Sequence, residues 1–189
     1  IYAGNILISD EIKEDAEKAL QKLKALGVKK TVMLTGDVKA SGEKIGTQLG
    51  LDEIYAELLP AEKVEKVELL ERNKSEKGVL IFIGDGINDA PSLARSDVGI
   101  AMGAMGSDAA IEAADIVIMN DKLSRVADAI EIARRTKRIV LQNIVFALGV
   151  KLVFILLGAF GEATMWEAVF ADVGVTILAV INSTRALKI

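Results

Sequence analysis

The chain contains neither cysteine nor histidine, and this absence excludes several kinds of site. Without cysteine no disulfide can form, which fits a cytosolic setting for the polar part of the chain. Without either residue the usual zinc ligands are missing, so any metal site must use carboxylates and neutral oxygens. The net charge is −4 and the lysines and arginines form no continuous stripe, so nucleic acid is not an expected partner.

Aromatic residues are scarce at 4%, although apolar residues reach 51% and are most concentrated in the last quarter of the chain. The length of 189 residues suits one domain with a sizeable core, or a smaller domain with an appendage. No initiating methionine or signal-peptide pattern opens the sequence. We therefore expect a fragment, or one half of a split protein.

Residues 79–102 organise the rest of the chain. Residues 79–83 form an apolar run typical of a strand buried on both faces of a parallel sheet. The run ends in a glycine-bracketed turn carrying Asp85, Asn88 and Asp89. Ligands bind at this edge of open α/β sheets, and hard oxygen ligands suit Mg²⁺ accompanied by a phosphate. The alternative is an ordinary turn in which these residues only cap a helix.

Strands and helices alternate along the first two thirds of the chain, joined by short glycine-rich turns. This order predicts an α/β fold with a doubly wound parallel sheet. The expected strands are Ala3–Ser9, Thr31–Leu34, Ile54–Ala56, Val79–Ile83, Val98–Ala101 and Ile116–Met119. The expected helices are Asp10–Leu26, Val38–Leu49, Pro60–Asn73, one from Asn88, Ser107–Ala113 and one from Leu123.

Two further segments supply polar groups that we expect at the same edge of the sheet. Thr35, Gly36 and Asp37 directly follow one strand, and Lys63 lies on the helix that begins at Pro60. A hydroxyl, a lysine and carboxylates holding Mg²⁺ are groups that bind and polarise a phosphoryl group. Lys63 has an alternative interpretation as a solvated helix lysine.

The last quarter of the chain predicts a transmembrane hairpin. Residues 143–160 and 168–184 are each close to the length that spans a bilayer. A basic cluster at 134–138 and basic residues after 184 flank the hairpin on one side, which predicts that both ends are cytoplasmic. We therefore expect a first domain over residues 1–138 and two membrane helices over 139–189. The alternative is a helical hairpin buried in a soluble core.

Lys151 and Asp172 are the two charged residues within these apolar segments. A charge at the bilayer centre costs about 2.5–3.5 kcal/mol on insertion scales, so both need a reason to be there. Lys151 lies about 12 Å below Asn143 and Asp172 about 20 Å below Arg185, at 1.5 Å per residue. Either the two form a structural ion pair, or Asp172 binds a metal ion with Lys151 as its charge partner.

Four motifs together resemble the P-type ATPases and, more broadly, the haloacid-dehalogenase-type phosphotransferases. They are TGD at 35–37, PAEK at 60–63, GDGINDAPSLARSDVGIAMG at 84–103 and DIVIM at 115–119. The resemblance implies that Asp85 is the main Mg²⁺ ligand, supported by Asp89 and Asn88. It also implies that Lys63 neutralises the phosphoryl group, that Thr35 hydrogen-bonds it, and that Asp37 helps to hold the nucleotide-bound arrangement.

The departures from that family pattern are equally informative. The phosphorylated aspartate of a DKTGT segment is absent, as are a nucleotide-binding domain and the earlier membrane helices. The resemblance thus covers the second half of a phosphorylation domain and the last two membrane helices, and the chain alone is not expected to hydrolyse ATP. Alternatives are a haloacid-dehalogenase-type phosphatase, or a non-catalytic fragment that complements a partner chain.

The hairpin resembles that of the zinc-, cadmium- and lead-exporting heavy-metal ATPases. The segments that carry this likeness are Asn143-Ile144, Lys151 and WEAVFADVG at 166–174. It implies a multi-pass protein of the plasma membrane that exports a divalent cation and uses Mg²⁺ and ATP. The implied partners are the metal ion, the lipid bilayer and the upstream part of the same transporter.

Overall fold

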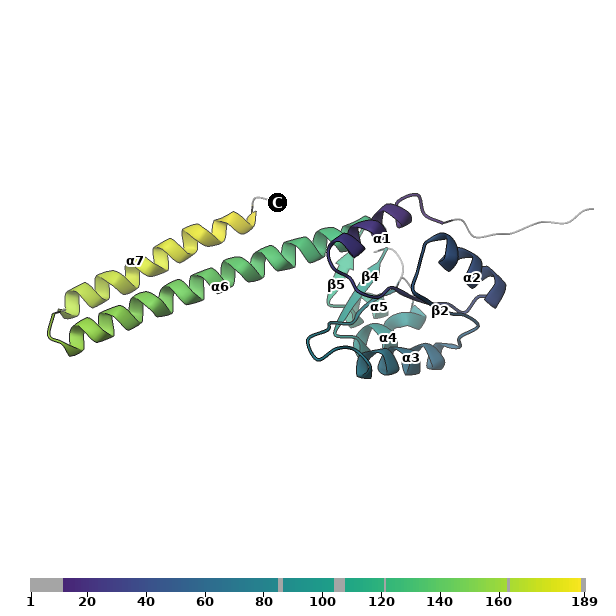
Figure 1. Cartoon of the computed structure of the whole chain (residues 1–189), viewed down its shortest axis with the longest axis horizontal. Coiled ribbons are helices and arrows are strands. Elements are labelled where there is room, and N and C mark those ends of the chain that lie inside the picture. Colours follow the sequence, from purple (N-terminus) through teal and green to yellow (C-terminus); the bar gives the residue numbers. More distant parts are fainter. Residues whose placement is uncertain (1–11, 85–86, 104–107, 121, 163, 188–189) are drawn as a thin grey trace, which may run out of the picture. The chain divides into compact units, whose positions relative to one another are not determined.

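The computed structural model describes residues 12–84, 87–103, 108–120, 122–162 and 164–187 (Figure 1). The chain divides into two compact units, Ile1–Ala127 and Asp128–Ile189. This division falls inside a long helix and precedes the domain boundary expected at residue 138. The expected strand Ala3–Ser9 lies outside the described residues.

The first unit alternates strands and helices in the expected order. Its strands are β1 (Val32–Leu34), β2 (Glu53–Tyr55), β3 (Ile81–Gly84), β4 (Val98–Met102) and β5 (Ile116–Ile118). Its helices are α1 (Ala16–Ala25), α2 (Lys39–Gln48), α3 (Pro60–Arg72), the short 3₁₀ turn η1 (Ile87–Asp89), α4 (Ala90–Arg95) and α5 (Asp108–Ala113). Helix α1 begins later than predicted, and ends as predicted at Gly27, whose φ of +87° suits glycine.

All the described strand pairings are parallel, as the alternation predicted. Strand β1 pairs with β2, and β4 lies between β3 and β5. Because parallel strands end at the same edge, Gly84 of β3 is level with Ala101 of β4, and Leu34 of β1 is level with Tyr55 of β2. The turns that carry the candidate site residues follow the strand ends Leu34 and Gly84.

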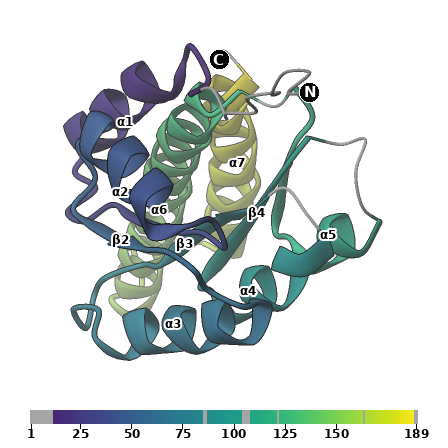
Figure 2. The same cartoon turned by 90° about the vertical axis from the view of Figure 1, so that its right-hand side faces the viewer.

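Helices α3 and α4 lie side by side, and α4 packs against β3 and β4 (Figure 2). Leu93 of α4 is almost fully buried against Ala101 and the ring of Phe82. Gly99 lets the helix approach this closely, because a Cβ there would lie 2.8 Å from the Leu93 carbonyl oxygen. This close packing holds the beginning of α4 next to the end of β3.

The second unit is a helical hairpin of α6 (Ser124–Ala159) and α7 (Met165–Ser183), followed by the 3₁₀ turn η2 (Thr184–Leu187). The helix expected from Leu123 and the apolar span expected at 143–160 are one continuous helix. No glycine or proline interrupts residues 124–148, so nothing in the sequence ends the first helix before the second begins.

Helix α7 begins three residues earlier than the predicted span. Thr164 and Glu167 form a capping box, in which the Glu167 carboxylate accepts from the Thr164 amide at 2.7 Å. Both helices are long and apolar enough to cross a membrane, and most of the side chains in their apolar stretches are exposed. That exposure does not support the alternative of a hairpin buried in a soluble core.

Candidate functional site

The TGD segment forms a tight turn directly after β1. The Thr35 hydroxyl donates to an Asp37 carboxylate oxygen at 2.7 Å and accepts from the Asp37 amide at 3.1 Å. The Leu58 amide donates to the Thr35 carbonyl at 3.1 Å, which ties the turn to the chain that follows β2. A Cβ at Gly36 would lie 3.3 Å from the Leu58 carbonyl oxygen, so glycine suits this crossing.

Lys63 and Asp89 form an ion pair, with 3.1 Å between the Lys63 ammonium and a carboxylate oxygen of Asp89. Their side chains are only 20% and 13% exposed. Lys63 is therefore not the solvated helix lysine of the alternative interpretation. Asp89 occupies the N-cap position of α4, yet its side chain makes no capping hydrogen bond. Its carboxylate faces the lysine of α3, unlike an ordinary helix-capping residue.

The end of β3 positions the Asp89 side chain. Gly84 is buried, and a Cβ built on it would lie 2.8 Å from the Asp89 Cβ and 3.0 Å from an Asp89 carboxylate oxygen. Because Gly84 has no side chain, the Asp89 carboxylate can lie against it, and Gly84 is the residue directly before Asp85 in the sequence.

Asn88 and Asp85 are the other two Mg²⁺ ligands that the sequence predicts. Asn88 lies in η1 with its side chain exposed, and Asp85 lies outside the described residues. Among the residues that the structure describes, no group of three acidic side chains gathers in one place. No hydrogen bond or ion pair in this described part of the chain joins the Thr35–Asp37 turn to the Lys63–Asp89 pair.

A carboxylate outside the predicted site anchors the first strand. Asp52 accepts from both the hydroxyl and the backbone amide of Thr31, each at 2.7 Å. These two hydrogen bonds lower the pKa of Asp52 below its usual value of 3.8, and the bond from the Thr31 hydroxyl contributes more than the bond from the amide. The ionised carboxylate therefore stabilises the junction at which β1 and β2 begin to pair.

In the hairpin, Lys151 and Asp172 lie at nearly the same level. Asn143 bonds to Ala179 and Ser183, so Lys151, eight residues further along α6, is about 12 Å beyond this point. Asp172 is seven residues before Ala179 and eleven before Ser183, about 10–16 Å in the same direction. The offset of about 8 Å expected from the sequence took Arg185 as the reference, whereas Asn143 contacts residues earlier in α7.

Both charged side chains are exposed in the hairpin unit, and no salt bridge joins Lys151 to Asp172 in the part of the chain that the structure describes. The backbone carbonyl of Asp172 accepts from the Thr176 hydroxyl at 2.9 Å. The structure therefore brings the two residues to one level of the hairpin without bonding them to each other.

Sequence reasoning missed two features that position these residues. The first is the contact between Gly84 and Asp89, which no local pattern predicts. The second is the bonding of Asn143 to α7, although an amide at the beginning of an apolar stretch is a signal for such a contact between membrane helices.

The sequence model of the haloacid dehalogenase-like hydrolase family matches residues 1–97, just over half of the 189-residue chain. The chain belongs to this hydrolase family. The match spans the TGD turn, the PAEK helix and the GDGxND loop, and the parallel sheet flanked by helices agrees with it. The predicted fold class is confirmed.

The similarity of this hydrolase-family chain to metal-transporting ATPases extends over its whole length. It is 63% identical to a cadmium, zinc and cobalt-transporting ATPase of Bacillus subtilis, over 100% of this chain and 27% of that protein. It is 60% identical to a zinc-transporting ATPase of Synechocystis, over 99% of this chain and 26% of that protein. The chain spans about a quarter of these relatives.

A solved structure of a zinc-transporting PIB-type ATPase, in its E2.Pi state, matches with a TM-score of 0.87 and 40% sequence identity. That match covers 95% of this hydrolase-family chain and 28% of the larger protein. The predicted resemblance to the heavy-metal P-type ATPases is therefore confirmed, and it includes the hairpin as well as the sheet.

Proposed function

We propose that the chain is the C-terminal portion of an ATP-driven exporter of a divalent heavy-metal cation, Zn²⁺, Cd²⁺ or Pb²⁺, that works through an aspartyl-phosphate intermediate. One observation carries the proposal: the similarity to zinc- and cadmium-transporting ATPases runs through both the catalytic unit and the hairpin. A soluble phosphatase of the same family has no need of an apolar hairpin of this length.

In this proposal Asp85, Asp89 and Asn88 hold Mg²⁺, which supplies charge to a phosphoryl group when bound. The donor set fits the ion, because it consists of carboxylate and amide oxygens. The close approach of Asp89 to Gly84 supports the fit, since it keeps the Asp89 carboxylate beside the residue that directly precedes Asp85.

Lys63 neutralises charge on the transferred phosphoryl group, and its pairing with Asp89 orients the ammonium before that group arrives. A lysine held at 20% exposure loses less freedom on binding a phosphate than a solvated lysine does. Thr35 donates its hydroxyl to the phosphoryl oxygens once that hydroxyl rotates away from Asp37. Gly36 and Asp37 keep the turn in shape and support the nucleotide-bound arrangement.

In the membrane hairpin Asp172 binds the transported metal and Lys151 is its charge partner. Their common level supports this role, because a lysine near an empty site compensates the carboxylate when the metal leaves. No cysteine or histidine is available in this chain, so a carboxylate is the strongest ligand that it offers to a divalent cation.

The remaining proposals concern the setting of the chain. Residues 1–138 form the cytoplasmic phosphorylation domain and residues 139–189 the membrane part, with the C-terminus also cytoplasmic. The protein is a multi-pass protein of the plasma membrane, and its partners are the transported cation, the lipid bilayer and the upstream part of the same transporter. ATP binds to a nucleotide domain outside these 189 residues.

The test uses the longer transporter that contains this chain. Asp172→Asn should abolish zinc-stimulated phosphoenzyme formation and ATP hydrolysis while the protein stays folded, and Lys151→Met should not rescue it. Glu162→Gln, which neutralises an exposed acid in the turn between the helices, is the matched control and should remain active. Recovery of zinc-stimulated turnover in the double variant would show instead that Lys151 and Asp172 are a structural pair.

A further inference from the structure

A cluster of side-chain amides joins α6 to α7 near one end of the hairpin. The Asn143 amide nitrogen donates to the Ala179 carbonyl at 3.2 Å and to the Ser183 hydroxyl at 2.9 Å. Its amide oxygen accepts from the Asn182 amide nitrogen at 2.8 Å. Asn143 thus uses both of its N–H groups and its carbonyl on α7. We call this set of contacts the amide clasp.

Arginines extend the amide clasp toward the end of α7. The Asn182 carbonyl oxygen accepts from the Arg185 guanidinium at 2.9 Å, and the Arg185 backbone carbonyl accepts from the Arg135 guanidinium, also at 2.9 Å. The contacts run in antiparallel order, because Arg135 precedes Asn143 on α6 while Arg185 follows Asn182 on α7. The contacts that join the two helices therefore agree on a single register, whereas the bond between Asn182 and Arg185 joins the end of α7 to η2.

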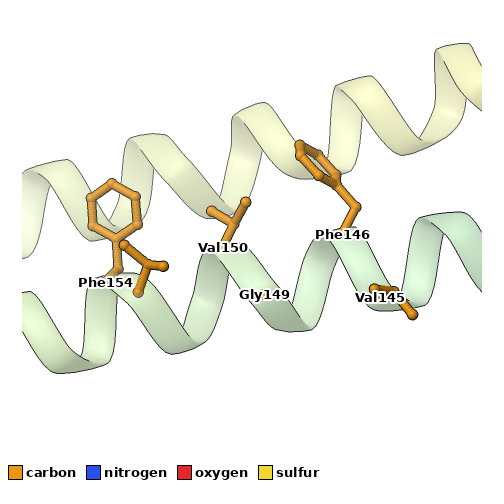
Figure 3. Close-up of a pocket in the computed structure, with 6 residues that line it drawn as sticks. Val145, Phe146, Gly149, Val150 and Phe154 are labelled. Carbon is orange, nitrogen blue, oxygen red and sulfur yellow. The ribbon is translucent and has the colours of Figure 1, made fainter.

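The apolar stretch beyond the clasp carries less information about register. On α6 a shallow apolar hollow is lined by Val145, Phe146, Gly149, Val150, Val153 and Phe154 (Figure 3). Glycine lies at its centre, and a Cβ built on Gly149 would meet nothing within 4 Å. Gly174 on α7 is equally free of close neighbours. Apolar contacts such as these specify register less strictly than hydrogen bonds do, because the attraction between apolar groups is not directional.

Hydrogen bonds do not tolerate the same movement. A shift of α7 by one helical turn moves each partner by about 5.4 Å, beyond the reach of a hydrogen bond. Asn143 would then lose its bonds to Ala179 and Ser183 and its bond from Asn182, and each lost bond disfavours the shifted register. A single polar residue in an apolar helix interface is known to select register in this way.

We propose that Asn143 is a positioning residue whose amide clasp sets the register of α6 against α7 and so holds Lys151 and Asp172 at one level. The effect on metal handling rests on the proposed function. The effect on register does not, because it concerns only contacts between the two helices.

The absence of cysteine makes a cross-linking test direct. Ala147 is one turn beyond Asn143 and Val175 is one turn before Ala179, so Ala147→Cys with Val175→Cys is the in-register pair. Ala147→Cys with Ala171→Cys is the pair displaced by one turn. In the full 189-residue chain in phosphatidylcholine nanodiscs, the in-register pair should oxidise about five-fold faster or more.

Asn143→Leu should reduce this preference to about one, and Asn182→Leu should do the same from the other helix. Asn143→Gln, which keeps the amide, should retain part of it. An unchanged preference in either leucine variant would overturn the proposal, and would show that apolar packing sets the register. If one leucine variant does not fold, the other decides the question.

Zinc activation of the longer transporter is measured separately. Asn143→Leu should raise the zinc concentration for half-maximal activity about five-fold or more, with a smaller change in the maximal rate. An unchanged zinc dependence, together with a lost register preference, would overturn the link between clasp and metal. If Asp172→Asn retained zinc activation, the proposed function would fail while the cross-linking result still stood.

Discussion

Replacing Gly84 by alanine should disturb the candidate site mainly through its contact with Asp89, which is tighter than the contact of 3.1 Å with the Phe82 ring. The added Cβ would lie 2.8 Å from the Asp89 Cβ, whereas ordinary contacts begin near 3.4 Å, so Asp89 must move by about 0.6 Å. That movement lengthens the 3.1 Å contact between Asp89 and Lys63 and weakens their hydrogen bond. We expect a loss of about 1–3 kcal/mol, the usual range for an extra methyl group in a packed interior.

Hydrogen exchange in the full 189-residue chain can measure this loss locally. A loss of about 1–3 kcal/mol corresponds to about 5- to 150-fold faster exchange of the amides in β3 and β4. Gly174→Ala is the matched control, because a Cβ there meets nothing within 4 Å. It should leave the exchange of these strands unchanged.

A double-mutant cycle identifies the cause of the effect. If Gly84→Ala acts by displacing Asp89 from Lys63, it should cost less in a Lys63→Met background, with a coupling energy of about 0.5–3 kcal/mol. Equal costs in both backgrounds would refute the reasoning and place the strain elsewhere, for instance on the ring of Phe82. Unchanged exchange in Gly84→Ala itself would refute the close contact.

Three further predictions concern single residues. Asp52→Asn should destabilise the chain at neutral pH, because the two Thr31 hydrogen bonds lower the Asp52 pKa below its usual value of 3.8. The stability that they add begins to fall below about pH 4 and is lost as pH falls through the lowered pKa, so denaturation of both proteins from about pH 7 to about pH 2 should show a steadily shrinking difference. Gly99→Ala should speed exchange in β4 by a factor matching about 1–3 kcal/mol, because its Cβ would lie 2.8 Å from the Leu93 backbone oxygen; wild-type exchange would contradict this. In the longer transporter Asp85→Asn should block phosphoenzyme formation, and normal formation would exclude Asp85 as the main Mg²⁺ ligand.

The sequence alone determined the order of strands and helices in the first unit. Short apolar runs ending in glycine or in polar turn residues specify strands locally, and the described strands start and end close to the expected residues. The sequence also predicted that Lys63 and Asp89 would lie at the same edge of the sheet, because parallel strands present their carboxyl ends there, although a solvated Lys63 remained the alternative. A likeness in four motifs then named the family.

Only the tertiary structure determined how closely these groups approach each other. The pairing of Lys63 with Asp89 depends on α3 and α4 lying side by side, and the space for Asp89 depends on the absence of a side chain at Gly84. Lys63 and Asp89 are 26 positions apart in the sequence, and Gly84 and Asp89 are five positions apart. No local propensity encodes such distances.

In the hairpin, too, the sequence predicted the helices, whereas the structure was needed for the way in which they pair. Apolar length predicted two helices capable of crossing a membrane, because hydrophobicity is a property of each segment by itself. The continuity of α6 and the register of α7 required the structure. Register depends on which amide meets which carbonyl across the hairpin, and Asn143 meets Ala179 and Ser183 only when the two helices pack together.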